Sequence, residues 1–111
     1  PLEVAAGKGF EERTARLRLI EGRALVETGE ADEGLAALKQ ALSSAIEMDD
    51  LSLQFLSHYH LWKAHVALGS PLRAEFELGA ARSHLRFSDE DCEESREVRA
   101  QQRSDEKGRT A

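Results

Sequence analysis

The sequence predicts an all-α protein built from stacked antiparallel helical hairpins. Strong helix formers dominate its 111 residues, chiefly Ala, Leu, Glu and Arg, whereas aromatic residues make up only 5%. Apolar residues recur at spacings of three, four and seven, which are typical of amphipathic helices. Gly, Asp or Pro residues interrupt the pattern where hairpin turns are needed. With 41% hydrophobic residues, the chain can form one domain with a modest core.

The stretch from Ala15 to Ala45 predicts the first hairpin. Its first helix should cover residues 10–28, with one apolar face made by Phe10, Leu17, Ile20, Ala24 and Thr28, and with Leu25 beside it. Gly29 can adopt the left-handed conformation that ends a helix, and Asp32 is placed to cap the next one. The second helix should end near Met48. Its expected buried stripe is Leu35, Leu38, Ala41, Leu42, Ala45 and Ile46, with Gly34, Ala37 and Ala41 small enough for close helix approach.

A second hairpin should follow. Either Asp49 or Asp50 can cap a third helix that ends at Gly69 and buries Leu51, Phe55, Trp62 and Val66. Ser70 and Pro71 then suit the cap and the first position of a fourth helix, which should run to about Arg86. Its apolar residues cover more than one face, as expected for a helix between two neighbours; they are Leu72, Phe76, Leu78, Ala81 and Leu85.

The ends of the chain are expected to be less ordered than its middle. We predict a linker over residues 1–9, a helical domain over 10–103 and a disordered tail over 104–111. A polar fifth helix should begin after a cap at Ser88, with acidic residues in its first turn where the helix dipole favours them. Val98 is almost its only large apolar residue, so this helix should bury little area.

Composition and motifs exclude several functions. The net charge of -6 disfavours nucleic acid and anionic membranes, and no apolar run is long enough to cross a bilayer. We therefore expect a cytoplasmic protein. Enzyme motifs and cofactor-binding loops are absent, which predicts a protein that is not an enzyme and has no cofactor. The single Cys92 is read as an inert surface thiol.

Four histidines raise the question of a metal site. His58 and His65 are seven residues apart on one helix, His60 should point away from both, and His84 is distant in sequence. Metal ligands on a helix need spacings of three or four, so we predict no metal site. We interpret His58 and His65 as packing residues, each with one hydrogen bond; a pH-sensitive contact and a metal-dependent regulator are the alternatives.

The two predicted hairpins align at an offset of 40 residues, the difference between positions 24 and 64. Identical pairs are Ala24 and Ala64, Val26 and Val66, Gly29 and Gly69, Leu38 and Leu78, Ala41 and Ala81, and Ser43 and Ser83. The first copy resembles the tetratricopeptide repeat family, with Gly22, Leu25, Gly29, Gly34, Leu38, Ala41 and Leu42 in the family's order. Leu61, Gly69, Ala74, Leu78 and Ala81 fit in the second copy, where Trp62 and His65 depart from the pattern. The period exceeds the family's usual 34 residues.

This resemblance implies a concave groove, lined by the first helix of each hairpin, that receives a peptide or helix of a partner protein. Helical phase then selects Arg16, Leu19 and Arg23, and the offset selects Tyr59 and Lys63. Such a groove would favour an acidic partner, although the family's carboxylate clamp uses Asn and this chain has none. We therefore predict a scaffold module of a larger regulatory protein.

The alternative hypothesis is self-association. Two hairpins and a polar helix are few for a repeat stack, so an open end can be closed by a second copy in a homodimer or other assembly. The N-terminal face that carries Phe10 and Leu17 is the expected contact, since the polar fifth helix should shield the other end.

Overall fold

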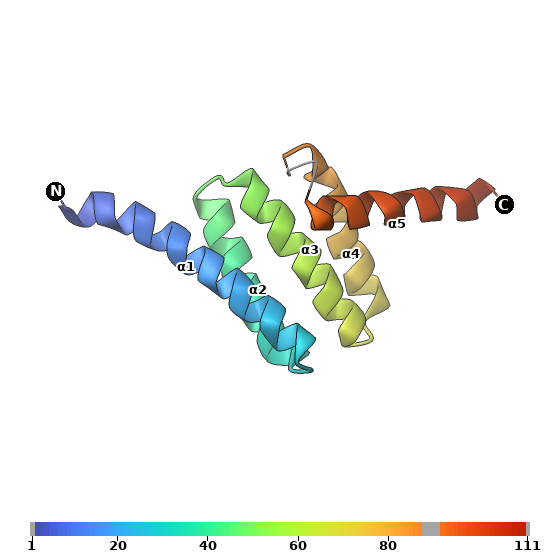
Figure 1. Cartoon of the computed structure of the whole chain (residues 1–111), viewed down its shortest axis with the longest axis horizontal. Coiled ribbons are helices and arrows are strands. Elements are labelled where there is room, and N and C mark those ends of the chain that lie inside the picture. The colour runs from blue at the N-terminus through green and yellow to red at the C-terminus, as the bar shows by residue number, and fades with distance from the viewer. Residues whose placement is uncertain (1, 88–91, 111) are drawn as a thin grey trace.

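The computed structural model describes residues 2–87 and 92–110, and the side chains of residues 9–86 and 92–104. These residues form five α-helices and a short 3-10 helix, with no strand among them (Figure 1). In chain order they are α1 (Leu2–Glu27), α2 (Ala31–Glu47), α3 (Leu51–Ala67), α4 (Pro71–Ser83), η1 (Leu85–Phe87) and α5 (Glu93–Thr110). The prediction of an all-α fold made of helical hairpins is thereby confirmed.

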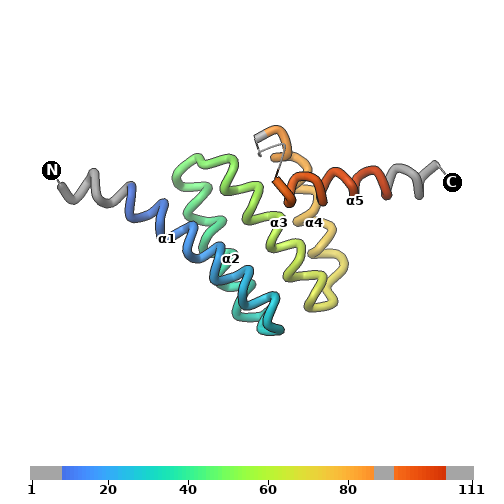
Figure 2. Tube along the Cα trace, viewed as in Figure 1, coloured from blue at the N-terminus to red at the C-terminus, as the bar shows by residue number. Residues whose placement is uncertain are grey.

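The two antiparallel hairpins, α1 with α2 and α3 with α4, lie side by side along the chain (Figure 2). Helix α2 packs against α3, and α1 also contacts α3 across the junction. The N-terminal part of α1 and the C-terminal part of α5 project at opposite ends, which gives the molecule extents of 60 × 30 × 21 Å (Figure 1). None of the helices in the described residues combines the length and apolar character needed to cross a bilayer.

Several element ends differ from the sequence-based expectation. Helix α1 begins at Leu2 rather than near residue 10, so residues 2–9 are helical instead of a linker. Helix α5 continues to Thr110, through the segment expected to be a disordered tail. Helix α4 ends at Ser83, and η1 follows it. The expected cap at Ser88 lies outside the described residues.

Left-handed glycines end two of the helices, as predicted. Gly29 has φ of +90° and Gly69 has φ of +71°, a conformation that glycine adopts without a steric penalty. At each turn a backbone N–H reaches back to a carbonyl near the end of the helix: Glu30 donates to Leu25 at 2.7 Å, and Ser70 donates to His65 at 2.9 Å. These hydrogen bonds satisfy the last carbonyls of α1 and α3 and direct the chain back along each helix.

The predicted helix caps are only partly correct. Asp50 caps α3, because its Oδ1 accepts a hydrogen bond of 3.0 Å from the N–H of Leu53. Asp32, in contrast, lies in the first turn of α2, where its charge suits the helix dipole, and Glu30 occupies the cap position without a side-chain bond. Ser70 precedes Pro71 as predicted, but its side chain makes no capping bond.

Two glycines set the distance between α1 and α2. A Cβ atom added to Gly34 would lie 2.8 Å from the carbonyl oxygen of Gly22 and 2.9 Å from Cγ2 of Val26. A Cβ atom added to Gly22 would lie 2.6 Å from Cγ of Leu38. The helices therefore cross with their backbones almost in contact, which confirms the close approach expected at Gly34.

The core consists of two clusters that share α3. The first lies between the hairpins and contains Ala15, Leu19, Leu38, Ala41, Ala45, Leu53, Leu61 and Ala64. The second joins α3, α4 and α5 and contains Phe55, Tyr59, Leu78, Ala81 and Val98. Helix α3 is thus buried on two sides, while α5 joins the core through one large apolar residue.

The predicted buried face of α1 is wrong. Phe10, Leu17 and Ile20 are 69%, 64% and 62% exposed, whereas Ala15 and Leu19 are buried. Helix α1 is apolar on two opposite sides, and the side that faces α2 uses small residues that allow close contact but give a weak hydrophobic signal. The sequence pattern therefore favoured the larger side chains on the outer face.

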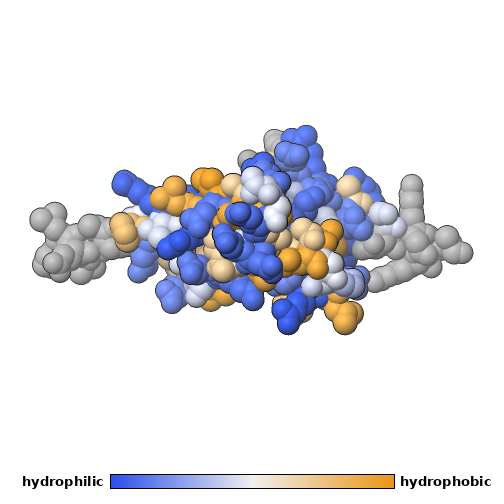
Figure 3. Space-filling model, turned by 90° about the horizontal axis from the view of Figure 1, so that it is seen from below, coloured by the Kyte–Doolittle hydropathy of each residue, from blue (hydrophilic) through white to orange (hydrophobic). Residues whose placement is uncertain are grey.

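Other apolar residues that were expected to be buried also lie at the surface. The exposed ones are Ile46, Leu51, Val66, Leu72 and Phe76. Helix α4 contacts both α3 and α5, but its buried residues are Ala74, Leu78 and Ala81, so the part of its surface that carries Leu72 and Phe76 stays uncovered. On the face seen in Figure 3, apolar groups are interspersed with charged ones rather than merged into one patch.

Candidate functional site

The candidate site is a groove of about 230 Å³ between α1, α3 and the beginning of α5. Each helix contributes one group of side chains to it. Its lining residues are Arg23, Val26 and Glu27 of α1, Tyr59, His60 and Lys63 of α3, and Glu93, Glu94 and Glu97 of α5. We call this set the groove. It is the place where basic residues of the two hairpins and acidic residues of α5 meet.

Two aromatic side chains of α3 form the buried part of the groove. Tyr59 and His60 are 6% and 8% exposed, and their rings meet edge to face with centroids 4.8 Å apart. Tyr59 also packs edge to face against Trp62 at 5.8 Å. These ring contacts fix the direction of the Tyr59 hydroxyl, which leaves the core and reaches α5.

Glu97 of α5 is held by two donors from α3. The Tyr59 hydroxyl donates a hydrogen bond to Oε2 of Glu97, and Nζ of Lys63 donates to Oε1 at 2.6 Å. Burial alone would raise the pKa of Glu97, but the hydrogen bonds from Lys63 and Tyr59 outweigh it and lower that pKa. Burial and the bond to Glu97 raise the pKa of Tyr59, so its hydroxyl stays protonated and acts as a donor.

The ammonium group of Lys63 is oriented by aromatic rings as well as by Glu97. Its Nζ lies 5.3 Å from the ring centroid of Trp62 and 6.0 Å from that of Tyr59. Attraction to the ring faces keeps the cation over α3. Lys63 is therefore positioned to hold a carboxylate at one fixed point of the groove.

Arg23 lies on the α1 side of the groove and is paired within its own helix. Its Nε donates to Oε1 of Glu27 at 3.1 Å, and this hydrogen bond raises the pKa of Arg23. Glu94 and Glu93 raise that pKa further through space. A guanidinium group that faces two carboxylates across a gap is suited to bridging to an additional anionic group.

His60 is neutral at physiological pH. Burial lowers its pKa to about 4, because the charged imidazolium would lose its hydration. Glu94 opposes this shift and Arg23 adds to it. His60 therefore contributes no charge to the buried part of the groove. The electrostatic potential there is set by the charged side chains that line the groove on the three helices.

Helix α5 is positioned by its cap and by two buried residues. The N–H of Ser95 donates to the sulfur of Cys92 at 3.4 Å, and the Ser95 hydroxyl donates to the Cys92 carbonyl at 3.0 Å. Ser95 and Val98 are fully buried, and Val98 packs against Phe55 and Tyr59. Cys92, predicted as a surface thiol, is half-buried and bonds to the first turn of α5 through Ser95, and Val98 is the apolar anchor of this helix.

Val98 and the Lys63–Glu97 pair each contribute little to the docking of α5. Burial of one Val side chain contributes roughly 1.5–2 kcal/mol. The Lys63–Glu97 pair is 44% and 35% exposed at its two side chains, and exposed pairs contribute about 0–1 kcal/mol after solvent screening. Helix α5 also has fewer contacts with the hairpins than the two helices of each hairpin have with one another.

The structure brings three of the five predicted groove residues together: Arg23, Tyr59 and Lys63 all line the groove. Arg16 lies outside it, where its Nε is 3.6 Å from Oε1 of Glu12. Leu19 is only 8% exposed and belongs to the first core cluster, so its assignment to the groove is wrong. Leu19 and Arg23 are four residues apart, so helical phase predicted that both would face the groove. The buried face of α1 includes Leu19, whereas Arg23 lies at the edge of that face and lines the groove.

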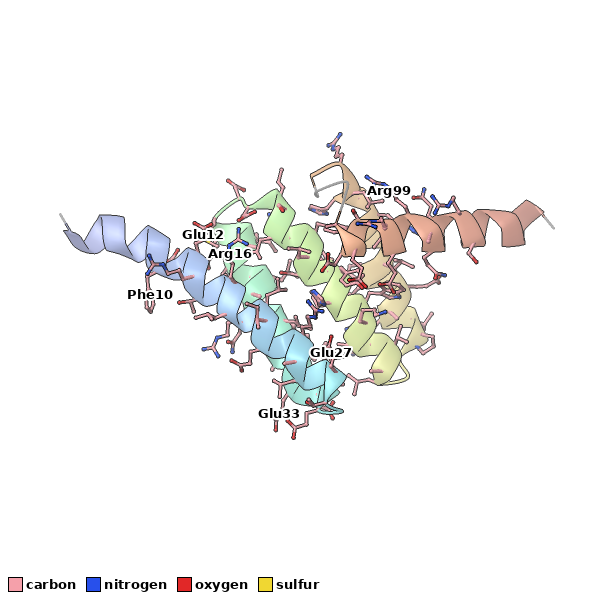
Figure 4. The ribbon with its side chains drawn as sticks, viewed as in Figure 1. Phe10, Glu12, Arg16, Glu27, Glu33 and Arg99 are labelled. Atoms are coloured by element: carbon pink, nitrogen blue, oxygen red, sulfur yellow. The ribbon has the colours of Figure 1, made fainter. Side chains whose placement is uncertain are left out.

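The labelled side chains of α1 show the two faces of this helix (Figure 4). Glu12, Arg16 and Glu27 lie on the side directed toward the other helices, and Phe10 points away from it. Phe10 and Leu17, the predicted self-association residues, are both exposed on that outer side. They are separate from the groove.

Sequence reasoning missed the acidic residues of the groove. Acidic residues were predicted for the first turn of the fifth helix, but no contact with the hairpins was predicted for them, and Glu97 was not singled out. The available signal was the concentration of acids at the start of a helix with one apolar residue, Val98. That pattern indicates a helix docked through its first turns, but it does not indicate the surface on which the helix docks.

The histidines do not form a metal site within the described residues, where no group of three or more ligating side chains comes together. His58 bonds Oε2 of Glu77 through Nδ1 at 2.7 Å, and its ring lies 5.6 Å from that of His84. His65 is buried, and its Nδ1 has no hydrogen-bond partner among the residues that the structure describes. His58 thus fits the packing interpretation, whereas His65 lacks the hydrogen bond expected for it.

The fold and the groove define the chain as an all-α protein of two antiparallel hairpins with a fifth helix docked on them. Comparison with protein-family models, with curated proteins and with solved structures gives no match. Its function is therefore argued from the groove itself.

Proposed function

We propose that the chain is a non-enzymatic protein-interaction module, similar to a tetratricopeptide repeat pair, that binds a carboxylate-bearing peptide or helix of a partner in the groove. One observation carries this proposal: Tyr59 and Lys63 already hold the carboxylate of Glu97, a residue of a separate helix. Because both donors are fixed by ring contacts, they are suited to receive a carboxylate from another source.

The groove also offers a second contact for the same kind of partner. Arg23 lies on the opposite side of the groove from Lys63, and its side chain pairs with Glu27 of the same helix. A partner with two carboxylates could engage Lys63 with one and Arg23 with the other. Val26, which belongs to the same lining, supplies an apolar contact that adds buried area.

The polar groups of the groove favour binding over catalysis. Tyr59 is kept protonated, His60 is neutral with a pKa far below physiological pH, and Lys63 is engaged with Glu97. General acid–base chemistry needs a group whose pKa lies near the working pH. We therefore propose recognition of a protein surface without chemical conversion.

A peptide selection tests the proposal and needs no identified partner. A random 12-residue peptide library is selected on the immobilised full chain, and the enriched peptides are titrated against two charge-reversed variants. We expect enrichment of acidic peptides that lose at least tenfold in affinity for Arg23→Glu/Lys63→Glu. The control Arg13→Glu/Lys39→Glu makes the same charge change at two exposed residues outside the groove and should keep its affinity.

Two results would contradict the proposal. One is a library that yields no binding peptide. The other is a set of binding peptides whose affinity falls equally in the groove variant and in the control, because this would show a response to net charge alone.

A second candidate function is self-association through the outer side of α1. It is favoured by Phe10, Leu17 and Ile20, all more than 60% exposed on one helix, since neighbouring exposed apolar residues of this size are typical of contact surfaces. Sedimentation velocity over a wide concentration range tests it. A dimer that dissociates on Leu17→Glu supports this candidate, and a monomer at every concentration removes it.

A further inference from the structure

We propose that α5 is an internal ligand of the groove, and that the partner is an amphipathic helix with acidic first turns that repeats the α5 pattern and displaces it. The inference rests on the proposed function and specifies the chemistry of the partner. The pattern consists of carboxylates at positions i, i+1 and i+4 and an apolar residue at i+5, as in Glu93, Glu94, Glu97 and Val98.

The geometry of α5 shows why these positions form one unit. Residues four apart share a helix face, so Glu93 lies above Glu97 and Glu94 lies above Val98. In the first pair, Glu97 bonds to Lys63 and Tyr59, and Glu93 lines the groove one turn away. The second pair places Val98 against Phe55 while Glu94 faces the groove. A helix with this pattern therefore matches the donors and the apolar surface at the same time.

The internal ligand fills the groove only in part. About 230 Å³ remains between α1, α3 and α5, and Arg23 on its far side interacts with Glu93 and Glu94 through space while its hydrogen bond goes to Glu27. A free helix with the same pattern is not tied to α4 through the chain, so it can move toward α1 and engage Arg23 as well. This additional contact would favour the external helix over α5.

If the partner and α5 compete for the groove, the affinity of the partner depends on how often α5 is away from the groove. If a partner binds only when α5 has left, its apparent dissociation constant equals the intrinsic constant divided by the fraction of molecules with an open groove. Removal of the charge on Glu97 weakens α5 without altering Arg23, Tyr59 or Lys63. Such a variant should bind an external helix with the α5 pattern more tightly than the wild type does.

The probe is a fluorescein-labelled peptide with the sequence of residues 92–103 and Ser in place of Cys92, titrated into the full chain by fluorescence anisotropy. We expect Glu97→Gln to bind it up to about fivefold more tightly than the wild type, a gain equal to at most about 1 kcal/mol. Glu33→Gln is the matched control, because it removes one exposed carboxylate of α2 outside the groove and should leave the affinity unchanged.

A second measurement uses the wild type alone and does not depend on the folding of any variant. Amide hydrogen exchange across residues 93–103 of the full chain should accelerate when the unlabelled peptide is added, since α5 leaves the groove. Exchange in α2 and α3 should stay slow. Equal affinities of the wild type and Glu97→Gln, with exchange of α5 unchanged by bound peptide, would overturn the inference.

The outcomes also separate this inference from the proposed function. If library peptides bind the groove but the α5 peptide does not, then α5 is not the template of the partner and only the inference is wrong. If the library also yields no ligand that depends on Arg23 and Lys63, the proposed function is wrong as well.

Discussion

The backbone contact between Gly22 and Gly34 makes Gly34→Ala a sharp test of the first hairpin. The added Cβ atom would lie 2.8 Å from the Gly22 carbonyl oxygen and 3.2 Å from the backbone N of Val26, so the two helices must separate. Overpacking against backbone costs up to about 3 kcal/mol. Alanine recovers about 1 kcal/mol through its higher helix propensity. The expected net loss of stability is about 2 kcal/mol.

The matched control is Gly79→Ala in α4. Gly79 is also a helical glycine, but it is exposed, and a Cβ atom added there would meet nothing within 4 Å. The same substitution should therefore stabilise the protein by roughly 0.5–1 kcal/mol. Urea unfolding of both variants, followed by circular dichroism, measures the difference of about 3 kcal/mol. A Gly34→Ala protein as stable as the Gly79→Ala protein would refute the close packing of α1 and α2.

Three further predictions follow from single residues. Burial lowers the pKa of His60 to about 4, below the value of about 6.5 for a His in the unfolded chain. The stability contributed by neutral His60 is therefore present above pH 6.5 and is lost as the pH falls toward 4. In urea titrations we expect the free energy of unfolding to be about 2 kcal/mol lower at pH 5 than at pH 7.5, and to depend less on pH in His60→Gln. Asp50→Ala removes the hydrogen bond to Leu53 and should cost about 1 kcal/mol in thermal unfolding, whereas Ser70→Ala should cost much less. Val98→Ala should accelerate amide exchange in α5 about tenfold or more, while exchange within the two hairpins stays slow.

The turns and the order of the helices could be predicted because they depend on local chemistry. Gly29 and Gly69 end helices through a conformation that favours glycine, and Asp50 caps α3 through an adjacent N–H. The small size of Gly34 was also informative, since only a residue without a side chain permits the observed approach of α1. Helix caps and glycine turns involve residues only a few positions apart, so a single sequence is enough to predict them.

The orientation of α1 could not be predicted because this helix is apolar on two sides. The larger residues Phe10, Leu17 and Ile20 gave the stronger periodic signal, yet the hairpin packs through Ala15 and Gly22. Small residues contribute little to hydrophobic periodicity, but they allow more contacts per unit of length once the backbones approach. The choice between the two faces depends on tertiary packing.

The groove was predicted in part for the hairpins, which also contribute the unpredicted Val26 and His60, and it was missed for α5. The resemblance to tetratricopeptide repeats implied a groove along the first helix of each hairpin, and helical phase and the offset then selected Arg23, Tyr59 and Lys63. Glu97 meets Lys63 across 34 residues of sequence, and no local pattern specifies such a contact. The contact between Lys63 and Glu97 depends on where α5 docks on α3, which is set by tertiary packing.

A titration of the ¹⁵N-labelled full chain with the α5-sequence peptide, followed by NMR, tests the central claim most directly. We expect the amide signals of Arg23, Tyr59 and Lys63 to shift together with those of residues 93–103, at the same peptide concentrations, while Lys39 on the outer side of α2 stays unchanged. Shifts confined to the outer sides of the hairpins, with the signals of the groove and of α5 unmoved, would contradict the claim that the groove binds a helix of the α5 pattern in place of α5.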